Sequence, residues 1–124
     1  MHVFHERRSQ RSDSRREALS LQLRASARRA QVEAMVLADH SGRVIARSDR
    51  DGVADELASF SPFLAKPTTW FGLVHFGGQP RPVAISPFRL GSQTAYLCAL
   101  GAQRKNLGGV ILQTTAGVRR IMRT

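Results

Sequence analysis

Residues 32–48 read VEAMVLADHSGRVIARS, an apolar run, a turn and a second apolar run. The first run, 34–38, is short and uniformly apolar, which is typical of a β-strand that is covered on both faces. The turn 39–42 has the sequence DHSG, and its glycine tolerates the positive φ that a chain reversal requires. A return strand begins over 44–46. This stretch therefore predicts a β-hairpin at the centre of the fold.

The length and composition are those of one ordinary globular domain, with 124 residues of which 42% are hydrophobic. No apolar run approaches the roughly 20 residues that a membrane helix needs, and the polar, Arg-rich N-terminus is unlike a signal peptide. Cys98 is the single cysteine, so no internal disulfide can form and a reducing compartment is the simplest one. We therefore expect a cytoplasmic protein with no membrane insertion.

The chain is strongly basic, since 19 Lys and Arg against 9 Asp and Glu give a formal net charge of +10. Residues 57–124 contain no Asp or Glu, which excludes a mechanism that takes a carboxylate base from this half. Residues 1–14 are polar and charged without apolar periodicity, and we predict a disordered basic arm there, followed by a single domain over 15–124. A basic surface attracts polyanions. The candidate polyanion contacts are Arg15, Arg16, Arg24 and Arg28.

Helical and strand patterns follow one another along the rest of the chain. Leu19, Leu23 and Ala27 recur at helical spacing and predict a first helix. The predicted elements in chain order are a helix over 15–30, strands over 34–38 and 44–46, a helix over 51–66, strands over 70–76, 81–90 and 93–100, and a closing helix capped by Asn106. This order, α-β-β-α-β-β-β-α, predicts an α/β (α+β) sandwich, a five-stranded antiparallel sheet with helices on both faces.

Three prolines depart from these patterns. Pro62 interrupts the apolar stripe of the helix over 51–66, so the helix is expected to kink or to restart there, with Ser61 as a cap. Pro82 and Pro87 each remove a hydrogen-bond donor from the strand over 81–90, which is therefore expected to be bent or incompletely paired.

Motifs that would carry catalysis are missing from the sequence. It has no GxxxxGK[ST] phosphate loop and no strand–GxGxxG–helix unit. Four histidines and one cysteine show no metal-ligand spacing. Asp39, His40 and Ser41 are the residue types of a hydrolase triad, but three consecutive residues in a turn cannot adopt its relay geometry. We expect a protein that is not an enzyme, without a catalytic, cofactor or metal site.

Three stretches resemble the Roadblock/dynein light-chain family, which has a profilin-like fold. They are the hairpin over 32–48, the segment DELASF over 55–60, and AYLCALGAQRKNLGGVILQTTAGVRRI over 95–121, which holds the last strand and the closing helix. The resemblance extends over about residues 17–122. It implies dimers in which the third strands pair edge to edge and the middle helices lie side by side. The implied interface residues are Val53, Leu57, Phe60, Leu64, Trp70, Phe71 and Val74.

The resemblance also implies a function. Prokaryotic proteins that resemble this one act as non-catalytic partners of small Ras-like GTPases, or as scaffolds in polarity and motility systems. The leading hypothesis is therefore a dimeric cytoplasmic binding module that regulates or scaffolds a small GTPase. Two alternatives remain open: a small-ligand sensory domain of a related sandwich fold, which needs an interior pocket, and a basic protein that binds nucleic acid or an anionic surface.

Overall fold

The computed structural model describes the backbone of residues 2–48, 53–101 and 107–123, and the side chains within these ranges from residue 14 onward. The order of its elements is the one that the sequence predicts. The elements are α1 (His2–Ala30), β1 (Val32–Ala38), β2 (Val44–Arg47), α2 (Val53–Leu64), β3 (Trp70–Phe76), β4 (Gln79–Leu90), β5 (Gln93–Gly101) and α3 (Leu107–Arg123). The predicted cap Asn106 lies outside the described residues.

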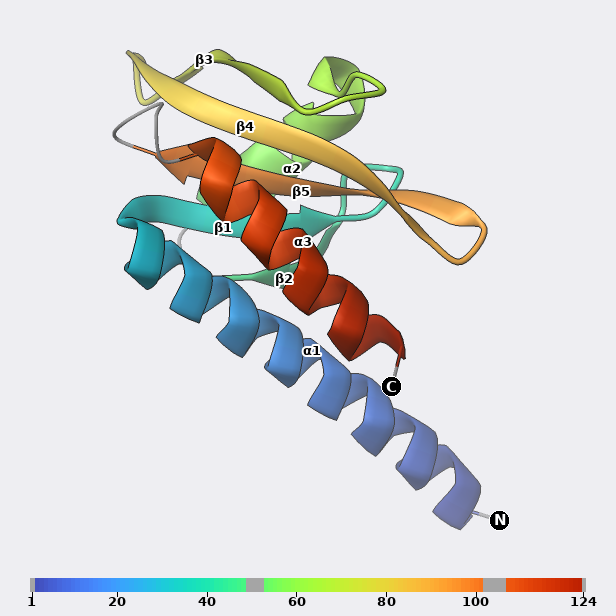
Figure 1. Cartoon of the computed structure of the whole chain (residues 1–124). Helices are drawn as coiled ribbons and strands as arrows, with labels where there is room; N and C mark the ends of the chain where they lie inside the picture. Colours follow the sequence, from blue (N-terminus) through green and yellow to red (C-terminus); the bar gives the residue numbers. More distant parts are fainter. Residues whose placement is uncertain (1, 49–52, 102–106, 124) are drawn as a thin grey trace.

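The strands form one five-stranded antiparallel sheet in the order β2-β1-β5-β4-β3. Helices α1 and α3 lie together on one face of this sheet, and α2 covers the other face (Figure 1). The predicted fold class, an α+β sandwich with helices on both faces, is confirmed. No helix within the described ranges has the length and apolar character needed to span a bilayer.

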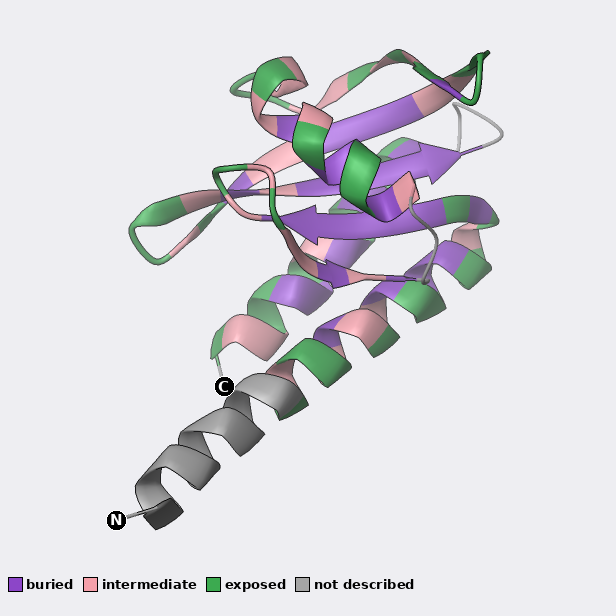
Figure 2. Cartoon of the chain, turned by 180° about the vertical axis from the view of Figure 1, so that it is seen from behind, coloured by how far each residue is buried: buried purple, intermediate pink, exposed green. Residues whose placement is uncertain are grey.

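Strand β1 is central because both of its faces are covered. Met35 and Leu37 are fully buried in the core beneath α1 and α3, whereas Val36 is fully buried in the core beneath α2. This explains why residues 34–38 are apolar without alternation. Figure 2 shows the same burial along β1 and β5.

The turn between β1 and β2 is held by one carboxylate. Asp39 Oδ1 accepts hydrogen bonds from the backbone N–H of Ser41 (2.9 Å), the Ser41 hydroxyl (2.7 Å) and the backbone N–H of Arg43 (2.9 Å). Gly42 has a φ of 89°. A Cβ atom there would also lie 3.1 Å from the carbonyl oxygen of Ala58, so the turn approaches α2 closely.

Helix α1 is longer than expected. It begins at His2 and so includes residues 2–14, where the sequence predicts a disordered arm. The division into an arm and a domain from residue 15 stays a prediction. In its second half α1 buries Leu19, Leu23 and Ala27, as the helical spacing predicts. It packs against α3 at Gly117, where an added Cβ would lie 2.6 Å from Gln22 Cδ.

Helix α2 continues through Pro62 to Leu64, so the predicted restart is wrong, and the alternative of a kink stays a prediction. Proline lacks the N–H that would bond the carbonyl oxygen of Ala58, four residues earlier. The Ser61 hydroxyl donates to this same oxygen at 2.7 Å, in a buried position. Ser61 therefore replaces the missing donor within one continuous helix.

Strand β4 also accommodates its prolines. It pairs with β3 over Gln79–Ile85 and with β5 over Val83–Leu90, so each neighbour covers only part of it. Pro82 has no partner in β5, and Pro87 has none in β3. The predicted incomplete pairing is confirmed, and each proline lies where one side of the strand needs no donor.

Candidate interaction site at the β3 edge

Strand β3 forms one margin of the sheet, and within the described part of the chain no strand pairs with its outer edge (Figure 1). On its inner side β3 pairs with β4 along its whole length, from Trp70 opposite Ile85 to Phe76 opposite Gln79. A free edge of seven residues offers a row of backbone N–H and C=O groups with which another strand can pair. The opposite margin, β2, has only four residues.

The side chains of β3 alternate between two environments. Trp70 and Val74 are half-buried and pack against the core beneath α2, where Phe76 is buried. Phe71 and Leu73 are on the opposite face of the strand and are 36% and 65% exposed. The edge is therefore free in its backbone and apolar in its side chains.

The Trp70 indole lies over the backbone of its own strand. A Cβ atom added at Gly72 would lie 2.4 Å from Trp70 Cη2, so only glycine leaves room for the ring. Phe60 of α2 meets Phe76 of β3 edge to face, with the ring centroids 6.0 Å apart. These aromatic contacts fix the α2 side of β3.

The predicted interface residues of α2 face their own sheet. Leu57 is completely buried and has no surface for a partner, so its assignment to an interface is corrected to the core. Val53, Phe60 and Leu64 are half-buried against the same core, and their contact with a partner stays a prediction.

Phe63, which the sequence reasoning missed, is 85% exposed and is the most exposed large apolar side chain of the described residues. The sequence does hold a signal for this exposure, because Phe63 is a large aromatic residue that lies outside the apolar stripe of α2.

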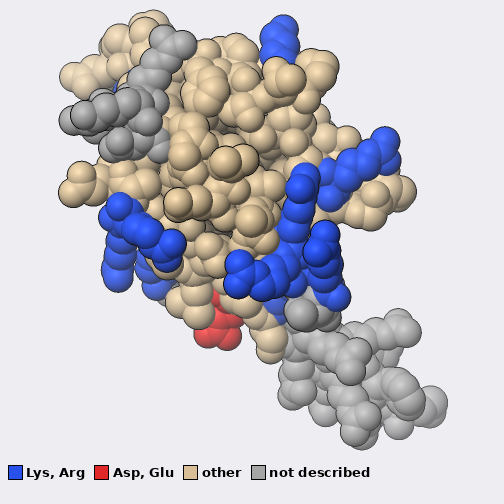
Figure 3. Space-filling view, in the orientation of Figure 1, with Lys and Arg blue, Asp and Glu red and all other residues tan. Residues whose placement is uncertain are grey.

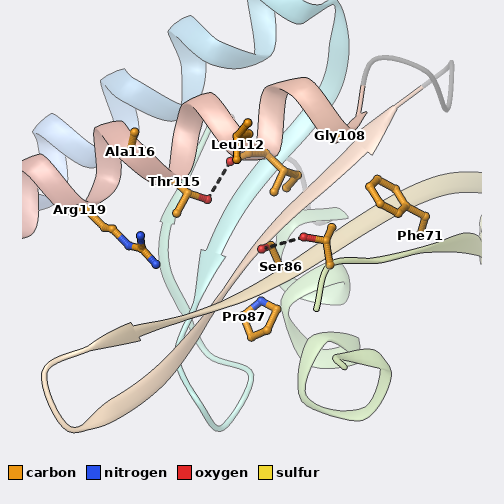
Figure 4. A pocket seen from close by; sticks show the side chains of 10 residues that line it. Phe71, Ser86, Pro87, Gly108, Leu112, Thr115, Ala116 and Arg119 are labelled. Carbon is orange, nitrogen blue, oxygen red and sulfur yellow. Dashed lines mark hydrogen bonds between the residues drawn. The ribbon is translucent and has the colours of Figure 1, made fainter. Parts of the chain in front are cut away.

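A surface groove runs between α3 and the β3–β4 pair (Figure 4). Its volume is about 550 Å³, and its walls include Phe71, Leu112 and Arg119. Leu112 is 77% exposed, so the groove is open rather than an enclosed pocket. Thr115 donates to the carbonyl oxygen of Ile111 at 2.8 Å, so its hydroxyl proton is already engaged. The groove adds apolar surface beside the β3 edge.

The candidate polyanion contacts lie along the described half of α1. Arg16, Arg24 and Arg28 are exposed and Arg15 is half-buried. Arg24 Nε donates to the carbonyl oxygen of Ser48 at 3.2 Å, which ties this side chain to the end of β2. Their role toward a polyanion stays a prediction.

Asp39 and Cys98, two residues of reactive types, have structural roles. Burial tends to raise the pKa of Asp39, but the hydrogen bonds from Ser41 and Arg43 outweigh it and lower this pKa below its ordinary value. Cys98 is completely buried; burial raises the pKa of its thiol to about 12, against a smaller opposing effect of Ser61. A carboxylate that holds a turn and a protonated core thiol are unsuited to nucleophilic or acid–base work.

Comparison with solved structures identifies the same fold in bacterial MglB proteins. Myxococcus xanthus MglB superposes with a TM-score of 0.59 at 16% identity, over 86% of this chain and 86% of that one. The gliding protein MglB of Thermus thermophilus gives 0.61 at 15% identity, over 88% and 91%. An MglB structure with a tetrameric arrangement gives 0.59 at 14% identity, over 88% and 90%.

No family model and no curated protein sequence matches the chain. At these identities the likeness to MglB concerns the fold, and it supports the Roadblock-like, profilin-like architecture that the sequence resemblance implies.

Proposed function

We propose that this chain is a non-catalytic, cytoplasmic binding module that dimerises through β3 and regulates or scaffolds a small Ras-like GTPase. The observation that carries the proposal is the free β3 edge, which is seven residues long, unpaired in the described structure and flanked by exposed Phe71 and Leu73. The MglB-like fold and the sequence resemblance support the choice of partner.

The physical argument for a dimer is the cost of leaving this edge open. A long apolar edge strand promotes aggregation unless it is paired or covered. Pairing with the β3 strand of a second copy satisfies the outer backbone groups of both strands by antiparallel hydrogen bonds. It also lets Phe71 and Leu73 of the two copies contact one another across the new strand pair.

Regulation by such a module needs no reactive group. A rigid dimer that binds one switch conformation of a GTPase more tightly than the other shifts the population toward that conformation. The small-ligand alternative requires an enclosed pocket, and the groove beside β3 is open, with Phe71 and Leu112 exposed in its walls.

The dimer is tested with the double variant Phe71→Glu/Leu73→Glu, measured by size-exclusion chromatography with light scattering. Four carboxylates across a two-fold strand pair repel one another, so we expect the monomer mass at micromolar concentration. The matched control is Leu21→Glu, because Leu21 is also an exposed leucine (56%) but lies on α1, which packs against β1, β2 and α3. A wild-type monomer, or a dimer that survives the double substitution, contradicts the proposed edge.

The partner is tested separately with a purified Ras-like GTPase from the same organism, loaded with GDP or with a non-hydrolysable GTP analogue. We expect tighter binding of one nucleotide state by calorimetry. Equal affinity for both states, or no binding by a protein that is dimeric, would overturn the regulatory role and leave the dimer intact.

A further inference from the structure

Helices α1 and α3 form a layer whose outer surface is strongly basic. The exposed arginines of the two helices are Arg16, Arg24, Arg28, Arg29, Arg119, Arg120 and Arg123. Among the described side chains of these helices Glu17 is the only carboxylate. Figure 3 views this face and shows basic side chains on both sides of it, with a single small acidic area.

Most of this charge has no carboxylate partner in the described structure. The two described ion pairs, Arg47 with Asp55 and Arg81 with Glu33, lie outside the layer. Arg119 and Arg123 line a hollow of about 360 Å³ together with Arg89 of β4, and the Arg119 guanidinium lies 5.9 Å from the centroid of the Phe88 ring. Several guanidinium groups are therefore held close together without neutralisation.

Stabilisation of helix ends explains part of this pattern. Arg28 and Arg29 lie in the last turn of α1, and Arg120 and Arg123 lie in the last turn of α3, where positive charge complements the helix dipole. This effect does not explain the apolar residues between the arginines.

Each helix of the layer also exposes one leucine. Leu21 of α1 is 56% exposed and Leu112 of α3 is 77% exposed. A surface that binds nucleic acid gains little from such leucines, since phosphates and sugars are polar. The interface of an anionic bilayer favours both residue types, because headgroups attract arginine and the acyl boundary takes up apolar side chains.

We propose that the outer surface of the α1/α3 layer docks peripherally onto membranes that contain anionic phospholipids. The arginines of α1 and α3 supply the attraction, and Leu21 and Leu112 enter the boundary between headgroups and acyl chains. Helix α2 lies on the opposite face of the sheet, so it stays accessible to protein partners. Leu112 and Arg119 also line the groove that has Phe71 in its wall, so the docking surface borders the proposed dimer edge on its α3 side.

The test is co-sedimentation of the full chain with vesicles of phosphatidylcholine alone or of phosphatidylcholine mixed with phosphatidylglycerol. We expect binding to the mixed vesicles that weakens as salt rises, and little binding to the neutral ones. Arg119→Gln/Arg123→Gln should weaken partitioning by about 20- to 30-fold, from about fivefold for each arginine. Leu112→Gln should weaken it by about five- to tenfold.

The matched control is Arg43→Gln/Arg47→Gln, which removes the same charge from the β1–β2 hairpin. Arg47 pairs with Asp55 of α2, so it is directed away from the α1/α3 layer. An equal loss in this control would overturn the assignment to the layer, as would equal binding to both kinds of vesicle. The proposal would also be overturned if the chain binds duplex DNA but not vesicles, and if this binding depends on Arg119 and Arg123 but not on Leu112. The ligand of the layer would then be nucleic acid. Thermal melting of each variant verifies that it is folded.

Discussion

The Ser61 hydroxyl should contribute far more to stability than a serine hydroxyl in a helix usually does. It donates a hydrogen bond to the carbonyl oxygen of Ala58, which has no backbone donor because residue 62 is proline. In Ser61→Ala the buried oxygen of Ala58 loses its donor at 2.7 Å. An unsatisfied buried carbonyl costs about 1–3 kcal/mol, and the better helix propensity of alanine returns about 0.5 kcal/mol. We therefore expect a net loss of about 0.5–2.5 kcal/mol in the free energy of unfolding.

The same substitution should be nearly neutral when Pro62 is also replaced. In Pro62→Ala the new backbone N–H can bond the Ala58 oxygen in the ordinary i→i−4 manner, so the Ser61 hydroxyl becomes redundant. The helix propensity of alanine at position 61 acts in both backgrounds, so the two substitutions are expected to couple by the cost of the unsatisfied carbonyl, about 1–3 kcal/mol, in a double-mutant cycle. The weak contact between Ser61 and Cys98 is lost in both backgrounds and cancels.

Urea unfolding, followed by far-UV circular dichroism and Trp70 fluorescence, measures all four proteins of this cycle. A loss of about 1.5 kcal/mol moves the midpoint by roughly 0.5–1 M. If Ser61→Ala costs the same with Pro62 and with Ala at position 62, the hydroxyl does not replace the missing donor. The explanation of the continuous helix would then be wrong.

Three further predictions concern packing and charge. Leu57→Ala should cost about 2–5 kcal/mol by urea unfolding because Leu57 is fully buried, whereas Phe63→Ala, at 85% exposure, should change stability by less than about 0.5 kcal/mol; comparable costs would contradict the assignment of Leu57 to the core. Gly117→Ala should stabilise α3 by up to about 1 kcal/mol in a Gln22→Ala background but not in the wild type, where the added Cβ meets the Gln22 amide. If Gly117→Ala changes the melting temperature by the same amount in both backgrounds, this contact is refuted. The folded-state pKa of Asp39 is lowered, so its contribution to stability is present above the ordinary pKa of 3.8 and is lost as the pH falls through the folded pKa. Asp39→Ala should therefore reduce the loss of stability at acid pH in a curve of unfolding free energy against pH. An unchanged loss would contradict the hydrogen-bonded turn.

The central hairpin could be predicted because its signals are local. Residues 34–38 are apolar without alternation, and a strand covered on both faces needs this pattern. The turn DHSG needs a glycine with positive φ, and Gly42 has it. The order of the remaining elements follows from helical and strand spacing in the same way.

The prolines show what a local pattern leaves out. A restart at Pro62 is expected from the missing donor alone, but the donor that replaces it is the side chain of the preceding residue. The effect of Pro82 and Pro87 depends on where β3 and β5 end, and this is a property of the whole sheet.

The candidate site was only partly predictable for a related reason. The helical period groups Val53, Leu57, Phe60 and Leu64 on one stripe, but it does not tell whether the stripe meets its own sheet or a partner. The structure gives Leu57 to the core and exposes Phe63 instead. That β3 lies at a margin depends on strand order, which a hydrophobicity pattern does not encode.

The buried thiol of Cys98 can report when the native structure opens. Alkylating reagents attack the thiolate, and they need direct access to sulfur. Since the thiol is completely buried and its pKa is about 12, it should be silent toward iodoacetamide until the sheet separates from α2. The rate of labelling at neutral pH would then measure how often the native structure opens enough to expose Cys98, without any engineered probe.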